Sequence, residues 1–499
     1  MTTDDSQRRS GSAAWIAGFV AVIALVVGIG LIASRDNTDE PLAAEPLVES
    51  TTSTAPPAES VPEEPETTTS TSTVPTVQTI DVWVADNGTT DTIQRLTAEH
   101  FTAQTGIAVN FGEFTQPEIR ERTVGTSHGG FPDVFTIDAF EAAQFGGVNG
   151  WTQDLTPFAE ADPDYDLDDI TPAIRELNSL STSFRGSEPT LGFYAAPFLA
   201  ESSVIMFNQE IMDAAGIAVP EQPTWQEIAE IAQLVHTDDV AGICLRTMPG
   251  WNDLGATLTT VVNTFGGTWL ESNEDGTPSE PQINQPDSDF RAATEFYVDL
   301  HQNFGPDTAD ATFPQCLELM ESGRVAMWFD STEAARVLNT GALAGNLGVA
   351  RAPTGPTGLP GGGLWSWGFA IPGGAENSEA GWEFIRWATS QEFIELVGQE
   401  EGWENAPGGT RLSTYGDPDY QDANEPYANV TLEELLAADP NNPGTTPRPG
   451  LPGVQFVGIP EFQDIATRCT QEISAAINGD ITVDEALDAC QAIFGEVSQ

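Results

Sequence analysis

The chain has 499 residues and a formal net charge of −59, from 17 basic and 76 acidic side chains, and every one of the 17 is arginine. A Walker A phosphate loop and a pyridoxal Schiff base both need a lysine amine, so a lysine-free chain belongs to neither class of enzyme. The acidic surplus also repels phosphate backbones, which argues against nucleic acid as a partner.

An uncharged apolar stretch at residues 13–34 predicts a transmembrane helix, because its length at 1.5 Å per residue matches one hydrocarbon thickness. Arg8 and Arg9 precede the stretch, so the positive-inside rule places residues 1–12 in the cytoplasm and everything after Arg35 outside. A cleavable signal peptide is the alternative, although the stretch exceeds the usual apolar region and no A-x-A site follows it. We expect a single-pass protein of the cell membrane with an extracellular C-terminal domain.

Residues 35–78 are rich in Thr, Ser, Pro and Glu and contain few large apolar side chains. Such a segment buries too little apolar surface to offset the entropy of ordering the backbone. It is expected to be a disordered linker that tethers a folded domain close to the membrane.

The folded part begins near residue 79. Residues 80–85, 108–114 and 133–137 have the pattern of strands, whereas 91–106 and 117–124 have the pattern of helices, the first of them closed by a glycine. Strands that alternate with helices predict an α/β fold with largely parallel sheets.

The C-terminal cysteines predict a disulfide across a helical hairpin. Cys469 lies in an expected helix at 461–477, Cys490 lies in the next helix, and a capping box at 482–485 begins that second helix. The two thiols would then face each other across antiparallel helices. Cys244 and Cys316 would form a second bridge by elimination, with two buried free thiols as the alternative.

Neither a metal nor a catalytic centre is expected. The four histidines have no metal-ligand spacing, and a run of alternating aspartates at 162–166 lacks the glycine and glutamate of a calcium loop. A G-x-S-x-G match at 125–129 follows a helix-like segment, whereas a nucleophile elbow follows a strand. No cofactor, catalytic residue or metal ligand is therefore predicted.

Several tryptophans stand beside glycine or acidic residues in apparent loops. An indole face packs on the C–H surface of a sugar or polyol, while carboxylates and amides bond its hydroxyl groups. Packing in the core is the alternative for each of them. The tryptophans in question are Trp251, Trp269, Trp365, Trp367 and Trp403.

Eight motifs in a fixed order resemble one family over nearly all of residues 79–499. They lie at 132–151, 194–217, 223–228, 242–251, 321–335, 361–372, 409–415 and 457–463. The chain resembles the extracellular solute-binding proteins of ABC transporters, in the group that includes maltose-binding protein, and most closely those that bind sugar alcohols of the sorbitol and mannitol type.

The resemblance implies a two-lobed periplasmic-binding-protein fold of type II with three interlobe crossovers. These are expected near 198–203, 327–330 and 361–365. Lobe 1 would then contain residues 79–200 and 329–363, and lobe 2 would contain residues 201–328 and 364–499. The ligand would lie in the cleft between the lobes.

The resemblance also implies which side chains contact the ligand. Four are expected to bond its hydroxyl groups, namely Asp138, Glu201, Asp330 and Arg411. Trp251, Trp365 and Trp367 are expected to stack on its carbons, and Asp253 is a further candidate.

The implied function is the binding of a sugar or polyol and its delivery to ABC permease subunits served by a separate ATPase. Ligand would shift an open form toward a closed one, and no bond would be made or broken. Many relatives are lipoproteins, but here no cysteine follows the apolar stretch at Arg35, so the helix itself would be the anchor. The alternative is an extracellular carbohydrate-acting hydrolase with paired carboxylates.

Overall fold

The computed structural model describes residues 78–125, 130–145, 150–181, 190–272, 278–279, 281–308, 310–448, 451–459 and 461–497. Residues 73–499 form a compact unit of their own. The predicted tail at 1–12, the predicted membrane helix at 13–34 and all but the last residue of the predicted linker at 35–78 lie outside the described residues. Within the described ranges, none of the helices combines the length and apolar character that crossing a bilayer requires.

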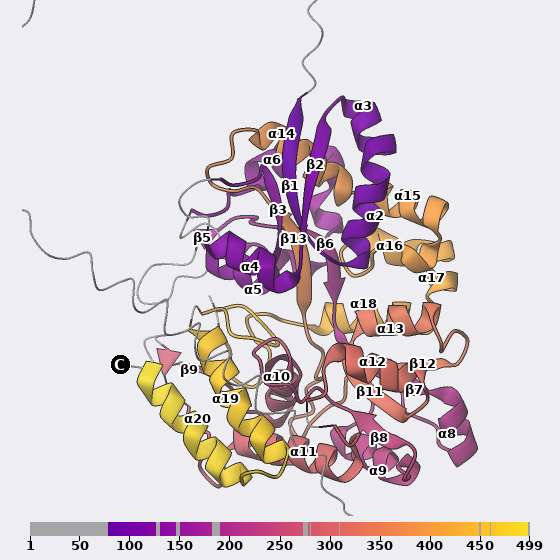
Figure 1. Cartoon of the computed structure of the whole chain (residues 1–499), viewed down its shortest axis with the longest axis vertical. Helices are drawn as coiled ribbons and strands as arrows, with labels where there is room; N and C mark the ends of the chain where they lie inside the picture. Colours follow the sequence, from indigo (N-terminus) through magenta and orange to yellow (C-terminus); the bar gives the residue numbers. More distant parts are fainter. Residues whose placement is uncertain are drawn as a thin grey trace, which may run out of the picture. The chain divides into compact units, whose positions relative to one another are not determined.

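A five-stranded sheet forms the centre of the first lobe (Figure 1). Its strands in spatial order are β2 (Ala108–Phe114), β1 (Thr79–Ala85), β3 (Val134–Asp138), β13 (Trp365–Ala370) and β6 (Ala196–Glu201). Strand β1 pairs in parallel with β2 and β3, whereas β13 runs antiparallel to β3 and β6. The central strands β3 and β13 are buried along their whole length, as expected for strands covered on both faces.

The first helix shows how local sequence sets the bounds of an element. It begins as α2 (Gly88–Leu96), where the Asn87 side chain accepts hydrogen bonds from two backbone N–H groups. It continues as the π-helix η1 (Thr97–Thr102) and α3 (Ala103–Thr105), and it ends at Gly106 in the left-handed conformation. The glycine at this end is the stop that the sequence predicts.

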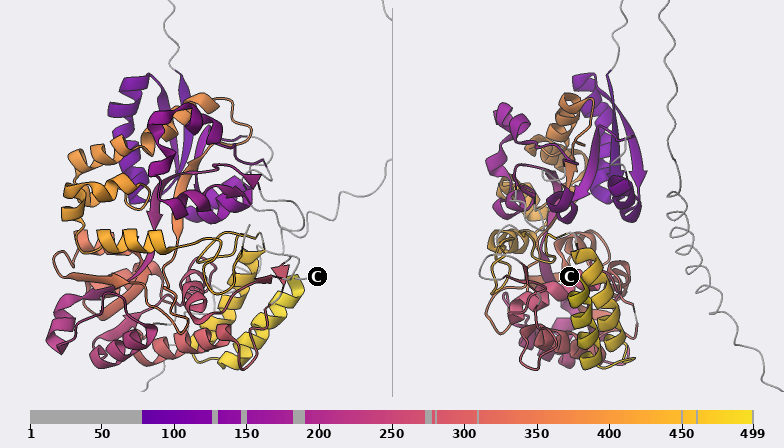
Figure 2. Two further views of the ribbon diagram at one scale, coloured as in Figure 1. Left: turned by 180° about the vertical axis from the view of Figure 1, so that it is seen from behind. Right: turned by 90° about the vertical axis from the view of Figure 1, so that its left-hand side faces the viewer.

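The other helices of the first lobe surround the sheet (Figures 1 and 2). They are α4 (Gln116–Gly125), α5 (Ala139–Phe145), α6 (Thr156–Ala161), η2 (Pro163–Tyr165), η3 (Leu167–Asp169), α7 (Pro172–Leu177), α14 (Ser378–Ala388), α15 (Gln391–Glu401), η4 (Trp403–Asn405), α16 (Leu412–Gly416) and α17 (Pro418–Ala423). A two-stranded ribbon joins β4 (Leu180–Ser181) to β5 (Thr190–Leu191).

A four-stranded sheet forms the centre of the second lobe. Its spatial order is β12 (Leu347–Arg351), β7 (Ser203–Asn208), β11 (Val325–Ser331) and β8 (Ala241–Cys244). Strand β11 is parallel to β8 and antiparallel to β7. Around it lie α8 (Gln209–Ala215), α9 (Trp225–Val235), α10 (Leu254–Phe265), α11 (Asp289–Phe304), α12 (Phe313–Glu321), α13 (Thr332–Thr340), α19 (Phe462–Ile477) and α20 (Val483–Val497), with a ribbon of β9 (Glu271–Ser272) and β10 (Pro278–Ser279).

Both disulfides are present. Cys469 and Cys490 join α19 to α20. At the start of α20 the backbone N–H of Thr482 donates to the Glu485 carboxylate, and the N–H of Glu485 donates to the Thr482 hydroxyl, which confirms the predicted hairpin. Cys244 and Cys316 form the second bridge, so the alternative of two free thiols is wrong. The alternation of strands and helices confirms the predicted α/β class. The expected largely parallel sheets are wrong, because β13 runs antiparallel to β3 and β6, and β7 runs antiparallel to β11 and β12.

The chain passes between the lobes at three places within the described ranges, but only two lie where they are expected. Strand β6 ends at Glu201 and β7 begins at Ser203, as predicted. The second passage is residues 352–364. The third is at α18 (Ala428–Ala437), which contacts α7, α16 and α17 of the first lobe and β7 and β12 of the second.

The predicted lobe boundaries beyond residue 328 are therefore wrong. Strand β11 continues unbroken through 327–330 into α13, and β12 pairs with β7, so residues 329–351 belong to the second lobe. Strand β13 and helices α14 to α17 belong to the first lobe instead of the second. A sequence pattern identifies a strand but does not show which sheet the strand joins. The prediction therefore assigns residues 329–351, and the segment from β13 to α17, each to the wrong lobe.

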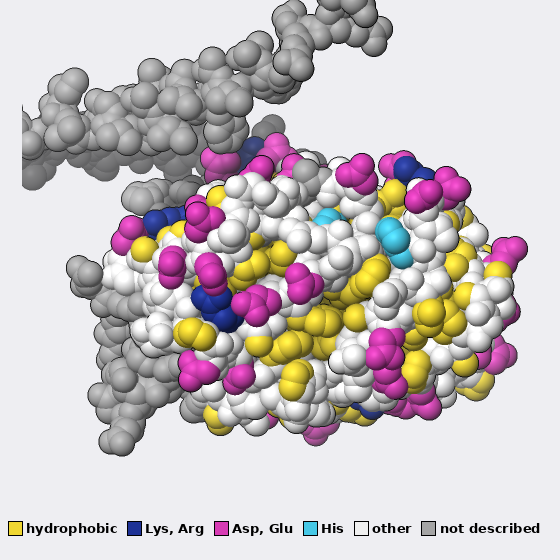
Figure 3. Space-filling view, turned by 90° about the horizontal axis from the view of Figure 1, so that it is seen from below, with side chains coloured by type: hydrophobic (Ala, Val, Ile, Leu, Met, Phe, Trp, Pro, Cys, Tyr) yellow, Lys and Arg dark blue, Asp and Glu magenta, His cyan; other side chains and the backbone are white. Residues whose placement is uncertain are grey.

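The acidic composition appears at the surface. On the face drawn in Figure 3, acidic side chains are spread widely between neutral and apolar ones, and arginines are few. A dispersed acidic surface keeps the folded chain soluble. The acidic composition therefore needs no binding role to explain it.

Candidate functional site

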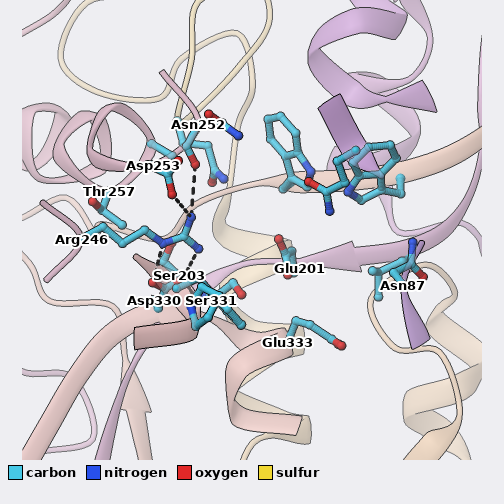
Figure 4. Close-up of a pocket in the computed structure, with 18 of the residues that line it drawn as sticks. Asn87, Glu201, Ser203, Arg246, Asn252, Asp253, Thr257, Asp330, Ser331 and Glu333 are labelled. Atoms are coloured by element: carbon cyan, nitrogen blue, oxygen red, sulfur yellow. Dashed lines mark hydrogen bonds and ion pairs between the residues drawn. The ribbon is translucent and has the colours of Figure 1, made fainter. Parts of the chain in front are cut away.

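A cavity of about 390 Å³ is lined by side chains of both lobes (Figure 4). The first lobe contributes Asn87, Gln116, Arg120, Leu199, Glu201, Trp365 and Trp367. The second lobe contributes Ser203, Arg246, Asn252, Asp253, Ala256, Thr257, Phe313, Pro314, Asp330, Ser331, Glu333 and Gln455. The volume suits a small molecule, and most of the lining residues are polar or charged, with apolar surface from the others.

On the second lobe, strand register brings Arg246 to Asp330. Strands β8 and β11 run parallel with Cys244 opposite Trp328, so the residues two positions further on are also adjacent. The Arg246 guanidinium donates from Nε to Oδ2 of Asp330 at 2.8 Å and from Nη2 to Oδ1 at 2.6 Å. This two-point pairing fixes the plane of the guanidinium.

Further contacts hold the same pair. Nη1 of Arg246 donates to the carbonyl of Asn252 at 3.2 Å, and the guanidinium lies 5.2 Å from the ring centre of Phe313. Asp330 also accepts from Nε1 of Trp328 and from the backbone N–H of Ser331. Burial opposes the charge of Arg246, but Asp330 outweighs it and holds the pKa of Arg246 above its usual range. Arg246 therefore stays charged in the cavity.

On the first lobe, Arg120 of α4 is paired with Asp138 at the end of β3. Its Nε and Nη2 donate to Oδ2 of Asp138 at 3.0 and 2.6 Å, and its Nε lies 3.6 Å from Oε1 of Glu141. The guanidinium lies 5.3 Å from the ring centre of Trp251 and 5.4 Å from that of Trp367. Asp138 is fully buried and does not line the cavity, so it positions Arg120 and does not itself face a ligand.

Strand β13 brings the two predicted indoles to one side of the first sheet. Trp365 lies opposite Glu201 on β6, and Trp367 lies opposite Asp138 on β3. Residues two apart on a strand share a face, so both indoles reach the same cavity. Trp251, which is also predicted to stack on the ligand, does not line the cavity, and its ring centre lies 6.0 Å from that of Trp365.

Glu201 is the last residue of β6, beside the first passage between the lobes. In Figure 4 it lies between Arg246 on one side and Asn87 on the other. Desolvation and the neighbouring Glu333 raise the pKa of Glu201 to about 8, against the opposing effects of Arg246 and a hydrogen bond with Ser331. Near neutral pH its carboxyl group therefore carries a proton, and it can donate a hydrogen bond as well as accept one.

Asp253 lies near the guanidinium of Arg246, with 3.9 Å between Oδ1 and Nη1. Burial raises the pKa of Asp253, and Arg246 opposes this. Its side chain is partly exposed and lines the cavity, as predicted.

Arg411, which is also predicted to contact the ligand, does not line the cavity. Its guanidinium is buried in the first lobe, where it donates to the carbonyls of Tyr165, Asp166 and Thr389. Asp166 has a φ of 50°, a conformation that an L-residue seldom adopts. Arg411 thus stabilises a tight turn by satisfying its carbonyl groups.

Other tryptophans named from the sequence also lie elsewhere. Trp269 is buried in the second lobe, where its Nε1 donates to Thr259 at 2.7 Å. Trp403 lies in η4 of the first lobe and does not line the cavity.

Sequence reasoning missed both arginines of the site. Arg246 lies within the family motif at 242–251, and Arg120 lies in the expected helix at 117–124. Arginines are scarce in this acidic chain, so one placed just after a buried strand is a signal for an internal ion pair. No group of three or more histidine, cysteine or acidic residues that could hold a metal occurs in the described part of the chain.

Two α/β lobes with a polar cavity between them define a binding protein whose ligand contacts both lobes. Residues 86–393 match the family model of the bacterial extracellular solute-binding proteins, and the chain belongs to this family. Such proteins serve ABC transporters outside the cytoplasm, in the extracellular or periplasmic space. Two disulfides agree with an oxidising compartment.

Three relatives indicate the kind of ligand to consider. The mannitol-binding protein of Pseudomonas aeruginosa is 34% identical over 422 residues, which is 83% of this chain and 92% of that protein. The erythritol/L-threitol-binding protein of Mycolicibacterium smegmatis is 26% identical over 312 residues, 59% of this chain and 63% of that protein. A solute-binding protein of Agrobacterium vitis, solved with bound D-mannitol, is 36% identical with a TM-score of 0.74, over 84% of this chain and 98% of its own.

The raised pKa of Glu201 predicts a pH-dependent stability. The folded state holds a proton on Glu201 that the unfolded chain releases above about pH 4.5, so this contribution to stability is lost as pH rises to about 8. Glu201→Gln carries no charge at any pH. We expect it to match the unmodified protein at pH 4.5 and to exceed it by roughly 1–3 kcal/mol at pH 9 in denaturant unfolding without ligand.

The same substitution at the exposed Glu210 is the matched control and should give no such trend. An equal difference between Glu201→Gln and the unmodified protein at both pH values would contradict the assignment.

Proposed function

We propose that this chain binds an uncharged linear polyol of the hexitol type, with D-mannitol the first candidate, in the cavity between its lobes. The observation that carries the proposal is the charge balance of the cavity. Each arginine in the lining is paired with a carboxylate of its own lobe, and the other acidic groups leave no surplus positive charge. Hydroxyl groups match such a lining because they both donate and accept hydrogen bonds.

The indoles of Trp365 and Trp367 supply broad apolar faces to the lining. A polyol has a carbon backbone whose C–H groups pack against such faces, while its hydroxyl groups bond to the polar side chains of the lining. The relatives that bind mannitol support this ligand class, since they share about a third of their residues with this chain.

In the proposed mechanism the lobes move as two bodies about the three passages between them. Each ion pair of the site lies within one lobe, so an open form keeps both arginines paired. A ligand that contacts Arg120 and Arg246 together favours the closed form, because it gains the contacts of both lobes only there. The closed form would be recognised by permease subunits of the transporter, which a separate ATPase drives.

Nothing in the relatives supports the alternative of a carbohydrate hydrolase. The ligand is therefore expected to leave the site unchanged.

Membrane attachment through residues 13–34 is a separate part of the proposal. The stretch is uncharged and long enough to span the hydrocarbon core, and the arginines before it favour a cytoplasmic N-terminus. The protein in its native membranes should resist extraction by alkaline carbonate. Its release by this treatment would contradict anchoring by the helix.

The charge balance predicts discrimination by ligand charge. In isothermal titration calorimetry we expect D-mannitol to bind one to one, and D-gluconate and D-mannitol 1-phosphate to bind at least about 100-fold more weakly, because like charges in a desolvated site cost several kcal/mol. D-Mannitol recovered after incubation should be unchanged. Tight binding of either anion, or conversion of the polyol, would contradict the proposal.

The stacking role of Trp367 predicts a loss of affinity on truncation. Trp367→Leu should weaken binding of D-mannitol about 10- to 100-fold, since buried tryptophans are typical hot spots. Trp403→Leu, in the same lobe but away from the cavity, is the matched control and should leave the Kd within about twofold. Equal affinities of the two variants would contradict the role.

A further inference from the structure

The Cys244–Cys316 disulfide joins two segments that both reach the cavity. Cys244 is the last residue of β8 and precedes Arg246 by two positions. Cys316 lies in the first turn of α12, the helix that begins with Phe313, and Phe313 and Pro314 both line the cavity. The bridge therefore ties the segment that carries Arg246 to the segment that forms the adjacent wall.

Hydrogen bonds tie the same two segments just beyond the bridge. The backbone N–H groups of Thr247 and Met248 donate to the carbonyl of Ala311 at 2.9 and 3.2 Å. The N–H of Ala311 donates to the hydroxyl of Thr247 at 2.7 Å, and both residues are fully buried. The bridge and these bonds lie on either side of Arg246 in sequence.

The contact of Arg246 with Phe313 requires α12 to keep its position beside β8. The guanidinium lies 5.2 Å from the ring centre, so a shift of α12 relative to β8 would remove the aromatic face beside the cation. Asp330 holds two nitrogens of Arg246 from β11, and β11 also packs against α12, where the ring centres of Phe313 and Trp328 lie 5.1 Å apart. The disulfide adds a covalent link between α12 and the segment that carries Arg246.

We propose that the Cys244–Cys316 disulfide is a positioning element of the binding site, which sets ligand affinity by holding Arg246 and the start of α12 in register. The inference rests on the proposed function, because it concerns affinity for the ligand of that cavity. It assigns the bridge a role beyond stabilising the fold.

The second disulfide provides the comparison. Cys469 and Cys490 join α19 to α20, and neither helix contributes a residue to the cavity lining. The Thr470 hydroxyl of α19 accepts a hydrogen bond from the backbone N–H of Gly250, but the helix and its packing on α10 and α11 keep Thr470 in place without the bridge. Loss of this disulfide should therefore affect stability and not affinity.

The test compares Cys244→Ala/Cys316→Ala with Cys469→Ala/Cys490→Ala in the purified chain. Calorimetry gives the Kd for D-mannitol and thermal unfolding without ligand gives the stability. Both double variants should unfold at lower temperature. The first should bind D-mannitol at least about tenfold more weakly, and the second should stay within about twofold of the unmodified protein. Unchanged affinity in the first, or an equal loss in both, would overturn the proposal.

If Cys244→Ala/Cys316→Ala does not fold, two single substitutions test whether the position of α12 beside Arg246 sets the affinity. Thr247→Val removes the hydroxyl that bonds Ala311, and Phe313→Leu removes the ring beside Arg246. Each should weaken binding about three- to tenfold. Thr294→Val is the control and should leave the affinity unchanged, because this buried threonine of α11 donates its hydroxyl hydrogen to the carbonyl of Phe290 in its own helix. Affinities equal to that of the control would overturn the proposal.

A ligand-free crystal structure separates this proposal from the proposed function. If the unmodified chain binds no D-mannitol, the proposed ligand is wrong, but positioning is still measured in Cys244→Ala/Cys316→Ala. Movement of α12 away from Arg246 in that variant supports positioning, and an unchanged distance between Arg246 and Phe313 overturns it.

Discussion

Two guanidinium groups in one sheltered cavity set the conditions for the rest of the site. A charge withdrawn from water must be paired, or it destabilises the fold by several kcal/mol. Arg120 meets this condition through Asp138, and Arg246 meets it through Asp330, in each case at the end of a buried strand. Because each pair belongs to one lobe, the lobes can separate without leaving a buried charge unpaired.

This arrangement explains why the site suits a neutral solute. The paired arginines present fixed N–H donors whose charge is already balanced, so hydroxyl oxygens can bond to them without a counter-charge. Glu201 adds a group that is protonated near neutral pH, placed where the chain first passes between the lobes. The indoles of β13 complete the lining with apolar faces. A ligand with many hydroxyls and no charge satisfies all three kinds of surface at once.

Much of the fold could be predicted from the sequence because it depends on local patterns. The alternation of Ile80, Val82 and Val84 identified β1, the glycine at 106 identified the end of its following helix, and the capping box before α20 identified the C-terminal hairpin with its disulfide. The lobe to which β12 and β13 belong could not be predicted, since it depends on partners far away in the sequence.

The same distinction applies to the site. Of the ligand contacts predicted from the family motifs, Glu201, Asp253, Asp330 and the two indoles of β13 line the cavity, whereas Trp251 and Asp138 do not. Arg411 was misplaced because a motif gives no information on whether an arginine faces a ligand or satisfies the carbonyls of its own lobe. Arg120 and Arg246 were missed because their role arises from strand register and from a helix that packs beside β1 and β2.

The most direct test of this account is a crystal structure of the protein with D-mannitol bound. The account predicts the polyol in the cavity between the lobes, with hydroxyl oxygens at roughly 2.7–3.2 Å from guanidinium nitrogens of both Arg120 and Arg246. A polyol that contacts only one lobe, or that lies outside this cavity, would contradict it.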